Sequence, residues 1–471
     1  MNINETLRDL NIGLPEDILR RKLYGDFEGA IRLIDRRLAR EDQPQGLRNC
    51  LIAEKEIMRR TPANYPYSRE QALALVREHI PDFSEEEFDE RVEAGKIGWI
   101  YIDGEMRFFN RFFQTMCKAE PAFALRAGIA SQSVESAKKG DKADGLLDRT
   151  RKKMAAEGQL SARIRIRAGI KLTDENFTPG MFLRLHLPIP SACEQQSDIR
   201  IDKIWPENGQ IAPEDALQRT VCWEGCVQEN QEFYVEYSYV HTAKFHDAYR
   251  TADVCPPAQE IPPDQLSLFT KEEAPHITFT PYIRQLVDRL SEGAQEPLEK
   301  ARRFYDFITL NMKYSFMPSY FILENISDTC ARNFTGDCGV FALLFITMCR
   351  CAGIPAQWQS GLTAEPDYIG CHDWARFYAE PYGWLYADPS YGTGAVRAGN
   401  EERRRFYFGN LDPYRMVANN AFQTGFTVEK KHWRADPYDN QTGEIESADR
   451  GYCSTELEHS LELLLCENIE L

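Results

Sequence analysis

The order of apolar and polar residues changes along the chain and divides it into parts. In the first part, apolar residues recur every three or four positions, which is typical of amphipathic helices; they include Ile18, Leu19, Leu23, Ala30, Ile31, Ile34 and Leu38. Ser68 with Gln71, and Ser84 with Glu87, have the spacing of capping boxes, which mark helix starts. The pattern predicts a mainly helical domain over residues 1–128.

One β-hairpin interrupts these helices. Residues 99–108 contain two aromatic-rich runs around Asp103-Gly104, a pair that favours a two-residue turn. The aromatic residues of this region form either a binding surface or a packing surface against a neighbouring domain; they include Phe109, Phe112 and Phe113. We expect the packing role, because no residue pattern nearby indicates chemistry.

Residues 129–161 are mostly polar and carry a basic cluster, which is typical of a solvated linker or helix face. The basic residues are Lys138, Lys139, Lys142, Arg149, Arg151, Lys152 and Lys153. In an acidic protein such a cluster could dock on an acidic neighbour, and nucleic acid is the less favoured partner.

Strict alternation of polar and apolar residues begins after this linker. Residues 163–167 and 232–239 alternate at almost every position, which predicts half-buried strands. Residues 182–187 and 201–205 are also strand-like. Four or more such strands, separated by turns, predict a small β-sandwich over residues 162–250. We interpret the histidines near it as structural or surface residues; they are His186, His241 and His246.

The most apolar run of the chain lies further on, between Val340 and Ala352. Its only strongly polar side chain is Arg350, so the run predicts a helix that is buried nearly all round, and a Gly and a Pro follow to end it. Cys338 stands at the first turn of this helix. Unpaired backbone N–H groups and the helix dipole at that position stabilise a thiolate.

Two aromatic-rich runs around a loop with Pro and Gly predict a hairpin after this helix. If Tyr378 pairs with Trp384, then His372 is the diagonal neighbour of Asp388 on one face of the sheet and within side-chain reach. Together with Cys338 these residues have the chemistry of a nucleophile, a base and a carboxylate that orients the base.

These residues resemble the transglutaminase-like superfamily of thiol enzymes. Gly336-Asp337-Cys338 before a long apolar helix, and His372-Asp373-Trp374 followed by Asp388-Pro389, are similar to the motifs of that superfamily in their order. The similarity covers about residues 276–395 and includes the stretch from Ala301 to Tyr314. The resemblance implies a papain-like α+β fold in which Cys338, His372 and Asp388 form the catalytic triad.

The fold class that we predict is therefore multidomain α+β. It consists of the N-terminal mainly helical domain, the small β-sandwich and a transglutaminase-like (papain-like) α+β catalytic domain over residues 271–425. A proline-rich connector, residues 251–270, precedes the catalytic domain. Residues 426–471 form a C-terminal extension that carries no recognisable motif.

Each candidate residue also has a structural interpretation. A free cysteine is most often a small core residue, which is how we interpret Cys349 and Cys351 in the apolar helix. A histidine in a strand is often structural, and an aspartate before proline often only starts a turn. The three-part pattern at ordered spacing favours catalysis. The side-chain donor for an oxyanion stays open among three residues upstream of the cysteine, namely Tyr314, Tyr320 and Asn333.

Composition adds limits on partners and compartment. A length of 471 residues suggests about three domains. The net charge of −17 argues against nucleic acid or an anionic membrane as a partner. No export signal is visible at the N-terminus, so we expect the 13 cysteines to be reduced thiols in the cytoplasm. Cys222 and Cys226 lack further metal ligands nearby, so we expect no metal and no cofactor.

We predict a thiol-dependent hydrolase of amide bonds, a peptidase or amidase, that acts on a protein or peptide substrate through a thioester intermediate. One alternative is a protein-glutamine acyl transferase (a transglutaminase), because the triad does not distinguish water from an amine as acyl acceptor. The other is a non-catalytic interaction protein that uses this fold as a scaffold.

Overall fold

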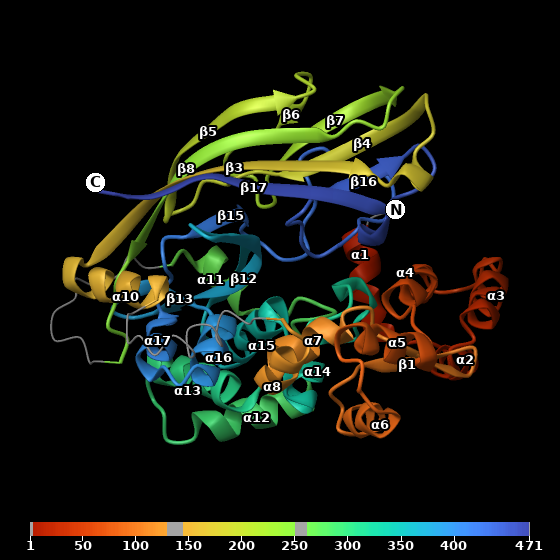
Figure 1. Cartoon of the computed structure of the whole chain (residues 1–471), viewed down its shortest axis with the longest axis horizontal. Coiled ribbons are helices and arrows are strands. Elements are labelled where there is room, and N and C mark those ends of the chain that lie inside the picture. The colour runs from red at the N-terminus through yellow and green to blue at the C-terminus, as the bar shows by residue number, and fades with distance from the viewer. Residues whose placement is uncertain (1–2, 130–144, 250–260, 471) are drawn as a thin grey trace. The chain divides into compact units, whose positions relative to one another are not determined.

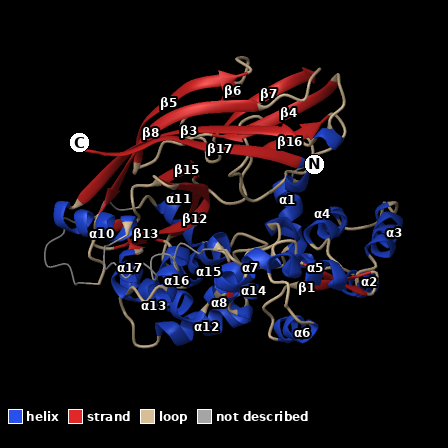
Figure 2. Ribbon diagram, viewed as in Figure 1, coloured by secondary structure: helices blue, strands red, loops and turns tan. Residues whose placement is uncertain are grey.

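The computed structural model describes residues 3–129, 145–249 and 261–470, and its helices and strands fall into two compact units (Figures 1 and 2). The first unit comprises Met1–Ala143, Glu273–Thr278 and Met312–Asp337. The second comprises Asp144–Glu272, Phe279–Asn311 and Cys338–Leu471. Two short segments of the region that we assigned to the catalytic domain therefore belong to the first unit.

The first unit is mainly helical, as its periodicity predicts. Its helices are α1 (Ile3–Arg8), α2 (Glu16–Tyr24), α3 (Phe27–Leu38), α4 (Gln45–Asn64), α5 (Arg69–His79), α6 (Glu85–Glu93), α7 (Phe112–Ala119), α8 (Pro121–Arg126) and α14 (Ile326–Asn333). Its strands are β1 (Trp99–Ile102), β2 (Glu105–Phe108), β9 (Lys313–Tyr314) and β10 (Thr335–Gly336). Both predicted capping boxes are present, at the starts of α5 and α6.

The predicted hairpin is also present, because β1 and β2 pair antiparallel with Ile102 opposite Glu105. The phenylalanines after it have a different role from the one we expected. Phe109, Phe112 and Phe113 are at most 5% exposed and belong to the core of the first unit itself. Phe316, from a segment that we had assigned to the catalytic domain, packs against this core.

The second unit contains the β-sandwich. Its strands are β3 (Gln159–Leu172), β4 (Met181–Pro188), β5 (Gln196–Trp205), β6 (Gln210–Ile211), β7 (Thr220–Val227), β8 (Phe233–Lys244), β16 (Glu444–Ser447) and β17 (Leu457–Ile469). One sheet has the order β16-β4-β7-β6 and the other β17-β3-β8-β5. The strands β16 and β17 come from the C-terminal extension, so the chain returns to the sandwich and adds one strand to each sheet (Figure 1).

The helix α10 (Leu146–Glu157) precedes the sandwich and carries part of the basic cluster. Arg151 on α10 forms an ion pair with Glu402 of α17 (Glu401–Phe406) at 2.5 Å, which is a contact with an acidic neighbour. The three lysines of the cluster at positions 138, 139 and 142 lie outside the described residues.

The rest of the second unit, which includes most of the predicted catalytic domain, is a five-stranded antiparallel sheet with helices. The strands are β11 (Ala356–Glu365), β12 (Tyr368–Ala379), β13 (Gly383–Ala387), β14 (Phe408–Gly409) and β15 (Arg415–Asn419), in the order β14-β13-β12-β11-β15. Besides α17, the helices are α11 (Pro263–Thr270), α12 (Pro281–Ser291), α13 (Pro297–Asn311), α15 (Cys338–Cys351) and α16 (Pro389–Arg397). Helix and sheet together confirm a multidomain α+β protein.

The helix α15 is the centre of this part. Every residue from Gly339 to Arg350 is buried, as the apolar run predicts. Phe345 on this helix packs edge-on against Phe377 of β12 with 5.4 Å between ring centroids. Cys338, the first residue of α15, contacts Asp373 of β12. Among the helices of the described ranges, none has an apolar stretch long enough to cross a bilayer.

Candidate active site

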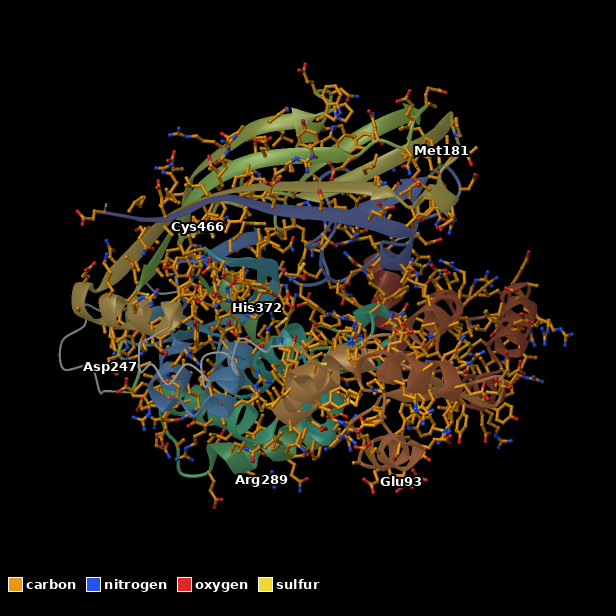
Figure 3. The ribbon with its side chains drawn as sticks, viewed as in Figure 1. Glu93, Met181, Asp247, Arg289, His372 and Cys466 are labelled. Carbon is orange, nitrogen blue, oxygen red and sulfur yellow. The ribbon has the colours of Figure 1, made fainter. Side chains whose placement is uncertain are left out.

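The predicted register of the hairpin decides whether His372 reaches Asp388. In the structure Tyr378 pairs with Trp384, and the last pair of the ladder is Ala375 with Ala387. Asp388 follows directly after β13, so it lies diagonal to His372. The His372 ring is bonded to it, because Nε2 lies 2.7 Å from Oδ2 of Asp388. Figure 3 labels His372 in its place on β12.

Both residues of this pair are almost completely shielded from water, with exposed fractions of 5% for His372 and 0% for Asp388. Burial lowers the pKa of His372 below its usual 6.5, although Asp388 acts in the opposite direction. Burial alone would raise the pKa of Asp388, but the nearby imidazole and guanidinium outweigh it and hold this pKa below 3.8. The pair is therefore a neutral imidazole hydrogen-bonded to a carboxylate at neutral pH.

A buried arginine also contacts the carboxylate. Nη1 of Arg415 lies 3.0 Å from Oδ2 of Asp388, and its Nη2 lies 2.6 Å from Oδ2 of Asp412. Arg415 is 0% exposed, and its guanidinium lies 4.3 Å from the ring centroid of Tyr391. The Tyr391 backbone N–H donates to Oδ1 of Asp388 at 2.9 Å. Three groups thus hold the carboxylate in one orientation towards the imidazole.

The thiol of Cys338 lies at the first turn of α15 and is partly exposed. It donates a hydrogen bond to Oδ2 of Asp373, the residue after His372, at 3.2 Å. Because Nε2 is bonded to Asp388, Nδ1 is the ring nitrogen left to accept a proton. The structure therefore bonds His372 directly to Asp388. It bonds the Cys338 thiol to Asp373, the residue after His372 on β12.

The sequence model of the transglutaminase-like superfamily matches residues 284–389. This part of the chain is a transglutaminase-like domain. The match contains all three candidate residues and confirms the resemblance seen in the sequence motifs.

Solved structures are similar to the chain at low sequence identity. A suggested cysteine protease from Cytophaga hutchinsonii is 14% identical with a TM-score of 0.44, and the match covers 66% of this chain and 92% of that chain. The periplasmic domain of TgpA from Pseudomonas aeruginosa is 14% identical with a TM-score of 0.29, and the match covers 54% and 96%. No curated protein matches the chain.

Three residues near the candidate active site were not predicted as site residues from the sequence. Arg415 and Gln441 lie beyond the matched region, and Asp373 was quoted within a motif without a role. Gln441 donates through Nε2 to the backbone carbonyl of His372 at 3.0 Å and to Oδ1 of Asp373. The Asp412-x-x-Arg415 pair inside an otherwise apolar run could have indicated a buried ion pair.

The three candidate side-chain donors for the oxyanion lie outside the second unit. Tyr314, Tyr320 and Asn333 all belong to the first unit. The Tyr320 hydroxyl donates to Oδ1 of Asp337 at 2.6 Å. The backbone N–H of Cys338 lies at the start of α15, in the second unit. Within the described residues, no group of three His, Cys, Asp or Glu side chains has the arrangement of a metal site.

Proposed function

We propose that the protein is a thiol-dependent hydrolase of amide bonds, with Cys338 as nucleophile, His372 as base and Asp388 as the residue that orients the base. The observation that carries the proposal is the buried 2.7 Å hydrogen bond between His372 and Asp388 next to a cysteine at a helix N-terminus. This combination supports proton transfer from the thiol to Nδ1 of His372.

In the reaction, Sγ of Cys338 attacks the carbonyl carbon and the thiol proton passes to His372. The negative oxygen of the tetrahedral intermediate accepts hydrogen bonds from preorganised donors, of which the Cys338 backbone N–H is one. His372 then gives the proton to the leaving amine and a thioester remains. Water attacks the thioester, again with His372 taking a proton, and the free thiol and the carboxylic acid are released. Asp388 stays ionised throughout and stabilises the imidazolium.

We choose water as the acyl acceptor because it is always present, and because the triad does not itself select an amine. We expect the substrate to be a protein or a peptide, and the reaction to need no metal. Reduced cysteines suit a cytoplasmic location, and the cysteines of the described residues are free thiols.

A peptide-library cleavage screen tests this function. We expect cleavage of a subset of peptides by the wild-type protein and none by Cys338→Ser. A parallel incubation with a glutamine-containing protein and a labelled primary amine tests the alternative acceptor. Stable incorporation of the label without cleavage would replace hydrolysis by acyl transfer, and no Cys338-dependent reaction in either assay would favour the non-catalytic scaffold.

A further inference from the structure

A segment outside the transglutaminase-like domain reaches the candidate active site. Residues 420–443 follow β15 in an irregular course before β16. Gln441, near the end of this segment, bonds to both consecutive residues of β12 at the site. Its Nε2 donates to the carbonyl oxygen of His372 and to Oδ1 of Asp373. The other oxygen of the same carboxylate accepts the hydrogen bond of the Cys338 thiol at 3.2 Å.

The three side chains form a continuous row in which Asp373 is the middle member. Asp373 is 5% exposed, so little water competes for its oxygens. A carboxylate that accepts a thiol hydrogen bond stabilises the protonated thiol and opposes the thiolate. An amide that donates to the same carboxylate withdraws part of its charge and restricts its rotation. Gln441 can therefore influence the thiol without touching it.

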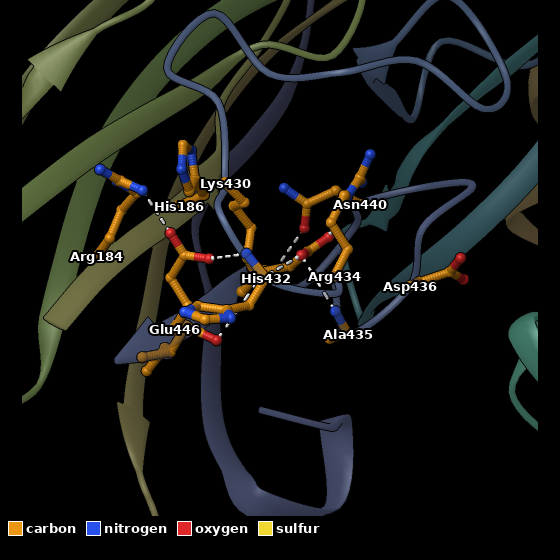
Figure 4. Close-up of polar contacts among 12 residues, drawn as sticks. Arg184, His186, Lys430, His432, Arg434, Ala435, Asp436, Asn440 and Glu446 are labelled. Atoms are coloured by element: carbon orange, nitrogen blue, oxygen red, sulfur yellow. Dashed lines mark hydrogen bonds and ion pairs between the residues drawn. The ribbon is translucent and has the colours of Figure 1, made fainter. Parts of the chain in front are cut away.

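The segment that carries Gln441 is anchored by buried charges (Figure 4). Glu444 bonds to Nζ of Lys430 at 3.0 Å and to Nε of Arg434 at 2.8 Å, and the side chains of all three are at most 5% exposed. Glu446 bonds to Arg184 of β4 at 2.5 Å and accepts from the backbone N–H groups of residues 431 and 432. Breaking a buried pair of this kind costs about 3–5 kcal/mol, so the segment is held in one position.

The residue before Gln441 is anchored as well. The carbonyl oxygen of Asn440 accepts from Nδ2 of Asn419 on β15 at 2.8 Å, and Oδ1 of Asn440 accepts from the N–H of Gly443 at 2.9 Å. These bonds join Asn440 to β15 on one side and to Gly443, the residue before β16, on the other. The anchored residues on either side of Gln441 therefore hold its side chain in position.

We propose that Gln441 is a positioning residue of the active site, which acts through the Asp373 carboxylate on the Cys338 thiol. The C-terminal segment then completes a site whose other residues come from the transglutaminase-like domain and β15. This inference rests on the proposed function, in which Cys338 is the nucleophile. The other titratable and charged groups of the site in the second unit are His372 and Arg415, which both contact Asp388.

The test is the pH dependence of Cys338 alkylation by iodoacetamide, followed by peptide mapping, in four proteins: wild type, Gln441→Ala, Asp373→Asn and the double variant. A nearby carboxylate shifts the pH midpoint of an ionisable group by about one unit, so Asp373→Asn should lower the midpoint by about that much. Gln441→Ala leaves the carboxylate more basic and should raise the midpoint. In the double variant the effect of Gln441→Ala should disappear, because the group through which it acts is gone.

Thr427→Ala is the matched control, because Thr427 is exposed and lies in the same segment. It should leave the midpoint unchanged. Equal shifts by Gln441→Ala with and without the carboxylate at position 373 would overturn the inference, and so would a lower melting temperature with an unchanged midpoint. A Cys338 that reacts no faster than other exposed thiols in the wild type would instead overturn the proposed function.

Discussion

Replacing Arg415 by leucine removes the only guanidinium that the structure places against the Asp388 carboxylate among the described residues. Arg415 and Asp388 are both 0% exposed, and Asp412, its second partner, is 1% exposed. Loss of one member of a buried ion pair costs about 3–5 kcal/mol, because the other charge stays behind without its partner. Single domains unfold with about 5–15 kcal/mol, so Arg415→Leu should lower the melting temperature clearly at neutral pH.

The decrease in melting temperature caused by Arg415→Leu should depend on pH. In the wild type the pKa of Asp388 lies below its unfolded value of 3.8, so its contribution to stability is present above pH 4 and is lost only in more acidic solution. In Arg415→Leu the positive charge of the guanidinium no longer opposes the effect of burial on Asp388, so the folded-state pKa of Asp388 rises. An acid whose pKa is higher in the folded state than in the unfolded state destabilises the folded protein at high pH. This destabilisation disappears as the pH falls and the acid becomes protonated. The difference in melting temperature should therefore be larger at pH 7.5 than at pH 5.

The assay is thermal unfolding of wild type, Arg415→Leu and Arg219→Leu at both pH values. Arg219 is a suitable control because it is also buried, at 4% exposed, but donates to the neutral backbone carbonyls of Ala212 and Pro190. Arg219→Leu should shift the melting temperature by the same amount at both pH values. An Arg415→Leu shift that is equally independent of pH would refute the interpretation of Arg415 as the counter-ion of the Asp388 carboxylate.

Three further predictions concern the five-stranded sheet and the proposed chemistry. Asp388→Asn should lower kcat/KM by about 10²–10⁴ on a cleaved peptide, because the amide favours the wrong imidazole tautomer; a loss below threefold would contradict this. Gly361→Ala should lower both activity and melting temperature, because its Cβ would lie 2.0 Å from the carbonyl oxygen of Met416 on β15, whereas Gly394→Ala, with no atom within 4 Å of the added Cβ, should leave activity unchanged. EDTA should not change the cleavage rate, and a loss that calcium restores would contradict the proposed metal-free reaction.

The hairpin of the site could be predicted from the sequence for a local reason. The loop between the two runs is short, and alternation with a period of two leaves one register that buries the apolar positions. That register places His372 next to Asp388, and the structure has the same pairing of Tyr378 with Trp384. The capping boxes and the buried helix were predictable for a similar reason, because each depends on residues only a few positions apart.

The remaining parts of the site depend on contacts between distant segments. Arg415 reaches Asp388 only because β15 pairs with β11 at the edge of the sheet, and no spacing in the sequence indicates that pairing. Gln441 reaches Asp373 only because the chain crosses from the five-stranded sheet to the sandwich before β16. The role of the C-terminal extension could not be predicted from its sequence, because its strands β16 and β17 form sheets only by pairing with the distant strands β4 and β3.

The most direct test of the central claim is the reactivity of Cys338 compared with that of the exposed thiols Cys226 and Cys371. The measurement is brief alkylation with iodoacetamide at pH 6.5 followed by peptide mapping, in the wild type and in His372→Ala. We predict preferential labelling of Cys338 in the wild type and loss of that preference in the variant, because a thiolate formed near neutral pH needs the imidazole. Labelling of Cys338 no faster than that of Cys226 and Cys371, or equally fast without the imidazole, would contradict a catalytic thiol activated by His372.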